Sequence, residues 1–192
     1  SPIKLSANES ALGPSPKAVK SYSSIGRGFV RYPDSDGTFF RKVLAKKFRL
    51  KRDRIILGSG SDQIFELVCK LFLNKGDEVI VPEYSFIIYR IYSRMFGARV
   101  RYAKEENFKP SVKSILDQVT RKTKIVFLAN PNNPTGTYLD KFEILKLRKK
   151  LRSDILLVID DAYYEYINDP NYASGIRLFS KSKNVLVTRT FS

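Results

Sequence analysis

Short apolar runs alternate with amphipathic stretches along most of this chain, and the alternation limits the possible folds more than any other feature of the sequence. From about residue 31 onward, each apolar run is followed by a stretch in which apolar side chains recur at helical spacing. Strands that alternate with helices in this way predict an α/β domain with a mostly parallel sheet. Uninterrupted apolar runs such as residues 125–128 are typical of strands that are covered on both faces.

The same pattern predicts where each element lies. The expected strands are residues 54–57, 78–81, 98–102, 124–129, 155–159 and 184–188. The expected helices are residues 39–48, 62–74, 85–96, 111–119 and 140–151. Residues 1–30 contain Pro14 and Pro16, and we expect them to form a polar, irregular arm that precedes a domain of residues 31–192.

The chain is strongly basic, with a net charge of +16 from 35 basic and 19 acidic residues. Such a charge indicates an anionic partner, and nucleic acid has to be considered. The basic residues are dispersed, however, and the two densest clusters, residues 46–52 and 146–152, fall at expected helix C-termini, where cations complement the helix dipole. We therefore expect a lysine-rich solvated surface and no nucleic-acid partner.

The sequence contains no histidine and a single cysteine, Cys69. These residues therefore cannot form a Ser-His-Asp or Cys-His catalytic site or a histidine metal site, and proton transfer would need another group or a cofactor. Cys69 shares an apolar helix face with Phe65, Val68 and Phe72, which indicates a buried structural thiol. No apolar run is long enough to span a bilayer and the N-terminus is unlike a signal peptide, so we expect a cytoplasmic protein without a membrane partner.

Residues 57–62, Leu-Gly-Ser-Gly-Ser-Asp, follow the first expected strand and lead directly into a helix. Glycine lets the backbone approach a ligand, and a helix N-terminus offers free amides to a phosphate. Three interpretations are open on this segment alone: a mononucleotide-type phosphate site, a dinucleotide fingerprint, or a plain helix cap formed by Asp62. Gln63 stands where the dinucleotide fingerprint requires its third glycine, which weakens that interpretation.

Polar residues also follow three later strands. Residues 130–136, Asn-Pro-Asn-Asn-Pro-Thr-Gly, either form a proline-fixed turn or hold a side-chain amide rigidly at a strand end. Asp160 follows five apolar residues, and a carboxylate at the edge of a core needs a partner, either a cationic ring nitrogen or an arginine. Hydroxyl groups after residues 184–188 could bind a phosphate. Because ligands of such sheets bind beyond the carboxyl ends of the strands, these features predict one common site.

Three of these segments, residues 133–136, 160–163 and 190–192, resemble in the same order the motifs of fold-type I aminotransferases, which use pyridoxal 5′-phosphate (PLP). Residues 5–9 with 12–16, and residues 31–34, narrow the resemblance to the histidinol-phosphate aminotransferases. The resemblance covers essentially the whole chain. It implies the α/β fold of type I PLP-dependent transferases, with a mostly parallel central sheet and helices on both faces. Residues 1–30 would be an arm or small-domain segment, and residues 31–192 an incomplete part of the large PLP-binding domain.

The resemblance further implies which residues bind the phosphate of the cofactor. These are Gly60, Ser61, Asp62, Thr190 and Ser192. The lysine that binds the cofactor covalently is expected directly after Ser192, so the chain itself would contain no catalytic residue.

The remaining matched positions would contact the cofactor ring. Tyr84 would stack on the pyridine, with a plain core aromatic as the alternative. Asp160 would pair with the protonated ring nitrogen and keep the ring cationic. Asn133 and Tyr163 would hydrogen-bond the phenolic oxygen of the ring.

A homodimer with shared active sites is also implied, because Tyr32 would reach the cofactor phosphate of a neighbouring subunit. The alternative is that Tyr32 packs locally on the arm, and Asn8 is expected near the substrate. The implied reaction is amino transfer between histidinol phosphate and 2-oxoglutarate in histidine biosynthesis. Alternatives are another amino-acid aminotransferase, a PLP-dependent decarboxylase of a phosphorylated amino acid, or a non-enzymatic regulator built on the same fold.

Overall fold

A computed structural model describes residues 7–10 and 12–191, and the chain divides into two compact units, residues 1–40 and 41–192. The first unit contains helix α1 (Pro16–Ser23) and the 3-10 helix η1 (Gly26–Val30). The expectation that residues 1–30 are irregular is therefore wrong for α1. Pro16 lies in the first turn of α1, where a missing N–H and a fixed φ favour the start of a helix. The segment 5–9 used for the resemblance lies only partly within the described residues.

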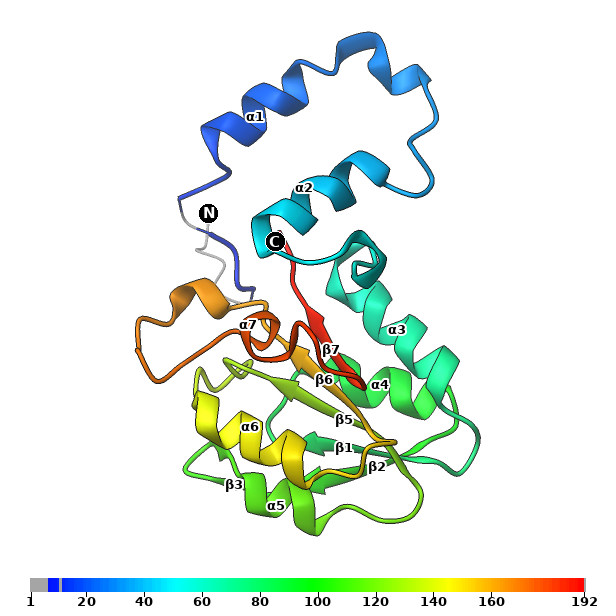
Figure 1. The fold of residues 1–192 in the computed structure, drawn as a ribbon, viewed down its shortest axis with the longest axis vertical. Coiled ribbons are helices and arrows are strands. Elements are labelled where there is room, and N and C mark those ends of the chain that lie inside the picture. Colours follow the sequence, from blue (N-terminus) through cyan, green and yellow to red (C-terminus); the bar gives the residue numbers. More distant parts are fainter. Residues whose placement is uncertain (1–6, 11, 192) are drawn as a thin grey trace, which may run out of the picture. The chain divides into compact units, whose positions relative to one another are not determined.

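The second unit is built on a five-stranded parallel sheet (Figure 1). Its strands are β1 (Glu78–Pro82), β2 (Arg99–Ala103), β5 (Thr123–Ala129), β6 (Leu156–Asp160) and β7 (Val185–Thr188). They are ordered β2-β1-β5-β6-β7, and every neighbouring pair is parallel. The predicted α/β fold with a mostly parallel sheet is confirmed.

Helices cover both faces of this sheet. They are α3 (Gly60–Phe72), α4 (Ile87–Met95), α5 (Val112–Asp117), α6 (Lys141–Lys150) and α7 (Gly175–Phe179). Helix α2 (Thr38–Phe48), which begins in the first unit, and the 3-10 turns η2 (Arg52–Arg54) and η3 (Tyr164–Tyr166) bury no residue. Alternate residues of each strand enter two separate cores, one beneath α3 and α4 and the other beneath α5, α6 and α7. Both faces are thus buried, as the uninterrupted apolar runs predict.

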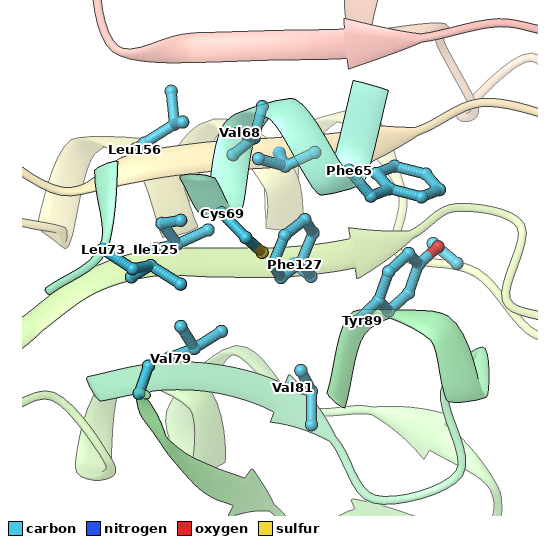
Figure 2. Packing of buried hydrophobic residues seen from close by; sticks show 13 residues of the cluster. Phe65, Val68, Cys69, Leu73, Val79, Val81, Tyr89, Ile125, Phe127 and Leu156 are labelled. Atoms are coloured by element: carbon cyan, nitrogen blue, oxygen red, sulfur yellow. The ribbon is translucent and has the colours of Figure 1, made fainter. Parts of the chain in front are cut away.

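The core beneath α3 and α4 contains the cysteine (Figure 2). Cys69 is fully buried and lies in the same cluster as Phe65, Ile125 and Phe127. Burial raises the pKa of its thiol to about 11, so the group stays protonated at neutral pH. The interpretation of Cys69 as a buried structural thiol is confirmed.

One expected strand is wrong. Residues 54–57 contain the end of η2 and an extended stretch, but no regular element follows η2 before α3. Ile55 has strand-like dihedral angles, with φ −118° and ψ 125°, yet Ile56 is 68% exposed and no strand in the described part of the chain pairs with this stretch. A strand is defined by its ladder of hydrogen bonds, so apolar composition alone did not make one here.

The structure also has a two-stranded hairpin that the periodicity does not predict. Strands β3 (Glu105–Glu106) and β4 (Lys109–Pro110) pair antiparallel around a turn of two residues, Asn107 and Phe108, that both have positive φ. Such a conformation is typical of tight hairpin turns. Two-residue strands are too short to produce a visible alternation in the sequence.

The basic cluster at residues 146–152 serves the fold in part. Arg148 donates hydrogen bonds to the carbonyl oxygens of Leu151 and Ile155, and Arg152 donates to those of Thr120 and Thr123. These contacts join the C-terminus of α6 to its neighbours and support a structural role for this cluster. Among residues 7–10 and 12–191, no helix combines the length and the hydrophobicity that a membrane crossing requires.

Candidate functional site

The carboxyl ends of four neighbouring strands meet at one edge of the sheet. Ala129 of β5 pairs with Asp160 of β6, and Asp160 pairs with Thr188 of β7, so these three strands end side by side. β1 lies on the other side of β5 and leads to Tyr84. The residues predicted from the strand ends therefore reach the same edge, as the topology of a parallel sheet requires.

Asp160 lies at the centre of this edge, with only 7% of its surface exposed. Its Oδ2 accepts a hydrogen bond from the hydroxyl of Tyr89 at 2.7 Å. Its Oδ1 accepts from the hydroxyl of Thr188 at 3.0 Å and from the backbone N–H of Ala162 at 3.2 Å. All three donors are uncharged, so a structural ion pair is not what satisfies this carboxylate.

Burial raises the pKa of Asp160 although its three hydrogen bonds act in the opposite direction. The negative charge of Asp62, in the first turn of α3, raises it further. Asp62 therefore lies close enough to Asp160 to influence it electrostatically, which brings the Gly-Ser-Gly-Ser-Asp segment to the same edge as β6. A positive group placed beside Asp160 would be stabilised by this uncompensated carboxylate.

The loop that follows β5 is closed by Asn130. Its side chain is fully buried and exchanges two hydrogen bonds with the backbone of Leu139, at 2.7 and 3.1 Å. The hydroxyl of Tyr172 donates to the carbonyl oxygen of Asn130 at 2.6 Å. This asparagine therefore has a structural role and fixes both ends of the loop.

The next asparagine in this loop carries an unpaired polar atom. The Nδ2 group of Asn132 donates to the carbonyl oxygen of Tyr84 at 3.3 Å and to the hydroxyl of Thr135 at 2.8 Å. Its Oδ1 is buried and has no hydrogen-bond partner among the described residues. Buried polar atoms in native proteins are usually paired, so this acceptor lacks the hydrogen-bond donor that such an atom normally has. Asn133, the predicted amide, is half-buried beside it.

Tyr84 follows β1 and is 46% exposed, so the alternative of a plain core aromatic is not observed. Its ring centroid lies 5.4 Å from that of Phe108, at the tip of the β3–β4 hairpin. Its backbone N–H donates to Glu105 of the same hairpin at 3.2 Å. Tyr84 therefore presents an aromatic face at the sheet edge, held from behind by the hairpin.

The start of α3 has the features of an anion site. Gly60 has a φ of +70°, which L residues rarely adopt, and a Cβ at this position would meet nothing within 4 Å. The N-cap residue is Ser59, whose side chain makes no capping hydrogen bond, and its backbone N–H donates to Oε1 of Gln63 at 2.7 Å. Ser61 is half-buried and Asp62 exposed at this turn. The first-turn amides of the helix thus receive no side-chain cap from Ser59.

A second buried carboxylate adjoins the site. Oδ2 of Asp161 accepts hydrogen bonds from the hydroxyl of Ser174 at 2.6 Å and from the backbone N–H of Gly175 at 2.8 Å, which fixes the start of α7. Burial raises the pKa of Asp161 to about 7, and the nearby positive charge of Arg189 acts in the opposite direction. Its Oδ1 is buried without a partner in the described part of the chain.

The other predicted residues are placed as follows. Tyr163 and Thr190 are half-buried and follow β6 and β7. Asn8 and Tyr32 belong to the first unit, and Tyr32 is 99% exposed, so local packing of its ring on the arm is not observed. Ser192 lies outside the described residues.

Three residues at this edge are not identified from the sequence: Tyr89, Thr188 and Asn132. Tyr89 lies on the apolar face of α4 and reads there as an ordinary core aromatic, and Thr188 reads as the last residue of a strand. For Asn132 a signal was present, because three asparagines stand in one loop, but the sequence alone does not say which of them points inward.

Comparison with known proteins agrees with this geometry. The family model "Aminotransferase class I and II" matches residues 1–192. A curated relative from Pelagibacter ubique, named histidinol-phosphate aminotransferase, is 54% identical over 99% of this chain and 53% of its own length. One from Paramagnetospirillum magneticum, of the same name, is 45% identical over 99% of this chain and 52% of its own length. The chain thus spans about half the length of the curated relatives it matches.

Solved structures show the same fold. A putative histidinol-phosphate aminotransferase from Erwinia carotovora superposes with a TM-score of 0.93 at 25% identity, covering 100% of this chain and 56% of that one. Histidinol-phosphate aminotransferase from Sinorhizobium meliloti, solved in complex with PLP, gives a TM-score of 0.91 at 24% identity over 97% of this chain and 50% of that one. The match of the family model to the whole chain decides the assignment, and this chain belongs to the class I and II aminotransferase family.

Proposed function

We propose that the protein carrying this chain is a PLP-dependent transaminase that transfers an amino group between histidinol phosphate and 2-oxoglutarate in histidine biosynthesis. The observation that carries the proposal is the buried carboxylate of Asp160, which has only uncharged donors at the carboxyl edge of a parallel sheet. The choice of substrate is supported by curated relatives of that name at 40–54% identity. We further propose a cytoplasmic enzyme.

The residues at this edge fit the chemical groups of PLP. Asp160 offers a negative charge to a protonated ring nitrogen, and Asn132 offers an unused acceptor. The open space at Gly60 and the first turn of α3 suit a phosphate. When bound, PLP supplies the electron sink that transamination needs.

Each side chain would then have a distinct task. Asp160 would hold the proton on the ring nitrogen, because a cation beside a buried carboxylate is favoured. Tyr84 would stack against the ring from the side of the hairpin. Asn133 and Tyr163 would hydrogen-bond the phenolic oxygen of the ring.

The phosphate of the cofactor would be held mostly by backbone and hydroxyl groups. The contributing residues would be Gly60, Ser61, Asp62, Thr190 and Ser192. We propose that Tyr32 reaches the phosphate in a neighbouring subunit of a homodimer, and that Asn8 lies near the substrate. The exposure of Tyr32 supports its availability to another chain.

An amino-transfer assay of the complete gene product tests this proposal. We expect glutamate to form from 2-oxoglutarate only when histidinol phosphate and PLP are present. Asp160→Asn should lower the rate by roughly 100-fold or more, because it leaves a buried cationic ring without its counter-ion. Asp154→Asn is the matched control, since this exposed aspartate lies just before β6, at the opposite end of the strand.

The outcomes separate the alternatives. Absence of glutamate with histidinol phosphate, but formation with another amino donor, would contradict the substrate and retain the transaminase. Release of carbon dioxide without consumption of 2-oxoglutarate would instead identify a decarboxylase. No reaction of either kind, with no binding of PLP, would contradict the proposed function as a whole.

A further inference from the structure

Tyr89 of α4 reaches the proposed cofactor edge through its hydroxyl. Its hydroxyl donates to Oδ2 of Asp160 at 2.7 Å across 71 positions of sequence. The side chain is fully buried, so this hydroxyl has been removed from water together with the carboxylate that accepts its proton. A buried hydroxyl needs a hydrogen-bond partner, and here the partner is the buried carboxylate of the proposed site.

The ring of Tyr89 is fixed on several sides (Figure 2). It stacks on Phe127 of β5, with centroids 5.0 Å apart and an interplanar angle of 1°. Phe65 of α3 and Phe86, which precedes α4, meet it edge-on at 5.0 and 5.7 Å. In close-packed surroundings of this kind the ring cannot turn, so the direction of its hydroxyl is set by the apolar core.

The hydroxyl completes a three-point support for Asp160. Tyr89 holds Oδ2, while Thr188 and the N–H of Ala162 hold Oδ1, so three different parts of the chain fix the plane of the carboxylate. A carboxylate has room for about four hydrogen bonds, which leaves one acceptor position for a ligand. We propose that Tyr89 is a positioning residue of the cofactor site, whose hydroxyl aims the Asp160 carboxylate and keeps it ionised for a cationic ring.

The charges around Asp160 show why such a donor is needed. Burial and the negative charge of Asp62 on α3 both disfavour its ionised form. The hydrogen bonds from Tyr89, Thr188 and the backbone N–H of Ala162 act in the opposite direction. Removal of the Tyr89 hydroxyl should therefore raise the pKa of Asp160 and weaken its hold on a cation.

This inference rests on the proposed function, and its test uses Tyr89→Phe in the complete gene product. The variant keeps the ring that packs on Phe127 and removes only the donor. Tyr92→Phe is the matched control, because Tyr92 lies on the same helix, packs against the same core and is not one of the donors to Asp160. The probe is pyridoxamine 5′-phosphate, which lacks the aldehyde and therefore reports non-covalent contacts alone.

We expect Tyr89→Phe to weaken binding of pyridoxamine 5′-phosphate by roughly tenfold, as the loss of one hydrogen bond to a charged group implies. The loss of affinity on acidification should begin at higher pH than in the unmodified protein. In an Asp160→Asn background the same change should have little further effect, because the two residues act as a unit. Tyr92→Phe should bind like the unmodified protein.

Equal affinity of Tyr89→Phe and Tyr92→Phe would overturn the inference. So would a weakening that adds in full to that of Asp160→Asn, since the tyrosine would then act through packing. NMR titration of the Asp160 carboxyl group without cofactor is an independent measurement. Tyr89→Phe should raise the pKa of Asp160 in that titration. If that shift appears while the unmodified protein binds no cofactor, the proposed function fails and the coupling of Tyr89 to Asp160 stands.

Discussion

Asp160 and Asp161 are adjacent in the sequence, yet their side chains serve different parts of the fold. Asp160 accepts from Tyr89 and Thr188 at the sheet edge, whereas Asp161 binds the start of α7 through Ser174. Successive side chains of a strand point to opposite faces, and this alternation continues into the residue after β6. The pair therefore divides into a carboxylate for the site and a carboxylate for the scaffold.

The scaffold carboxylate should make stability depend on pH. Burial raises the pKa of Asp161 to about 7, against about 4 in an unfolded chain, so the folded state binds its proton more tightly. The contribution of protonated Asp161 to the free energy of unfolding is fully present below about pH 4. It is lost as the pH rises through 7, and the free energy of unfolding then falls by up to about 1.4 kcal/mol per pH unit. We expect the free energy of unfolding to fall less steeply over this window in Asp161→Asn, measured by urea denaturation.

A control separates this effect from titration in general. The hydrogen bond with Arg152 is the main cause that lowers the pKa of Asp154 in the folded protein. Asp154 therefore stops contributing to the free energy of unfolding only when the pH falls below the pKa that an aspartate has in the unfolded chain. Asp154→Asn should therefore leave the slope between pH 4 and 7 unchanged. Identical slopes in Asp161→Asn and the unmodified protein would show that Asp161 does not titrate in this window.

For single residues, the sequence predicts a place in the site when the local pattern alone requires a partner for the side chain. Asp160 is identified because a charge directly after five apolar residues needs a partner. Tyr89 is not identified, because its partner lies on a distant strand and its helical spacing matches that of any core aromatic. The roles of Asn133, Tyr163 and Thr190 stay predictions until a ligand is seen.

Among the elements, the loop between β5 and α6 depends on one side chain. Asn130→Ala removes both hydrogen bonds to Leu139, which is fully buried, and leaves its N–H and C=O without partners. We expect a loss of about 2–4 kcal/mol in the free energy of unfolding, measured by chemical denaturation. Asn171→Ala is the control, because this exposed residue hydrogen-bonds Asp169 and Lys141 through its backbone, which the substitution keeps. A loss no larger than that of the control would show that the loop is held by other contacts.

The helix that follows this loop begins with a capping box. The side chain of Asp140 accepts from the N–H groups of Phe142 and Glu143, both at 2.8 Å, and Glu143 accepts from the N–H of Asp140 at 2.9 Å. Asp140→Ala should destabilise the protein by about 1 kcal/mol, and Asp140→Asn by much less, because asparagine also caps. Thermal unfolding of the two variants measures the difference. Equal melting temperatures would contradict the role of the cap.

Elements with long apolar periodicity are predicted well, and short or unpaired ones are not. β1, β5, β6 and α6 lie within about two residues of their expected bounds, since each buries a regular pattern. The error at residues 54–57 has a physical cause, because a strand needs a neighbour that composition cannot reveal. Helix α1 was missed because it is short, buries no residue and lies in a polar segment that contains Pro14 and Pro16.

For the whole molecule, the parallel topology decides where chemistry can occur. All five strands of the sheet run the same way, so the residues after β1, β5, β6 and β7 share one edge although they are spread over more than a hundred positions. This rule made the candidate site predictable before its contacts were known. Pairing between subunits, with Tyr32 reaching a second site, depends on surfaces that no strand pattern encodes, and it stays a proposal.

The central claim is that this edge holds the PLP ring against Asp160. A crystal structure of the complete gene product grown with PLP tests it most directly. We predict the ring nitrogen at about 3 Å from a carboxylate oxygen of Asp160. The hydroxyl of Tyr89 should still donate to that carboxylate, and the cofactor phosphate should lie at the first turn of α3. A cofactor bound elsewhere, or one whose ring nitrogen faces away from Asp160, would contradict the account.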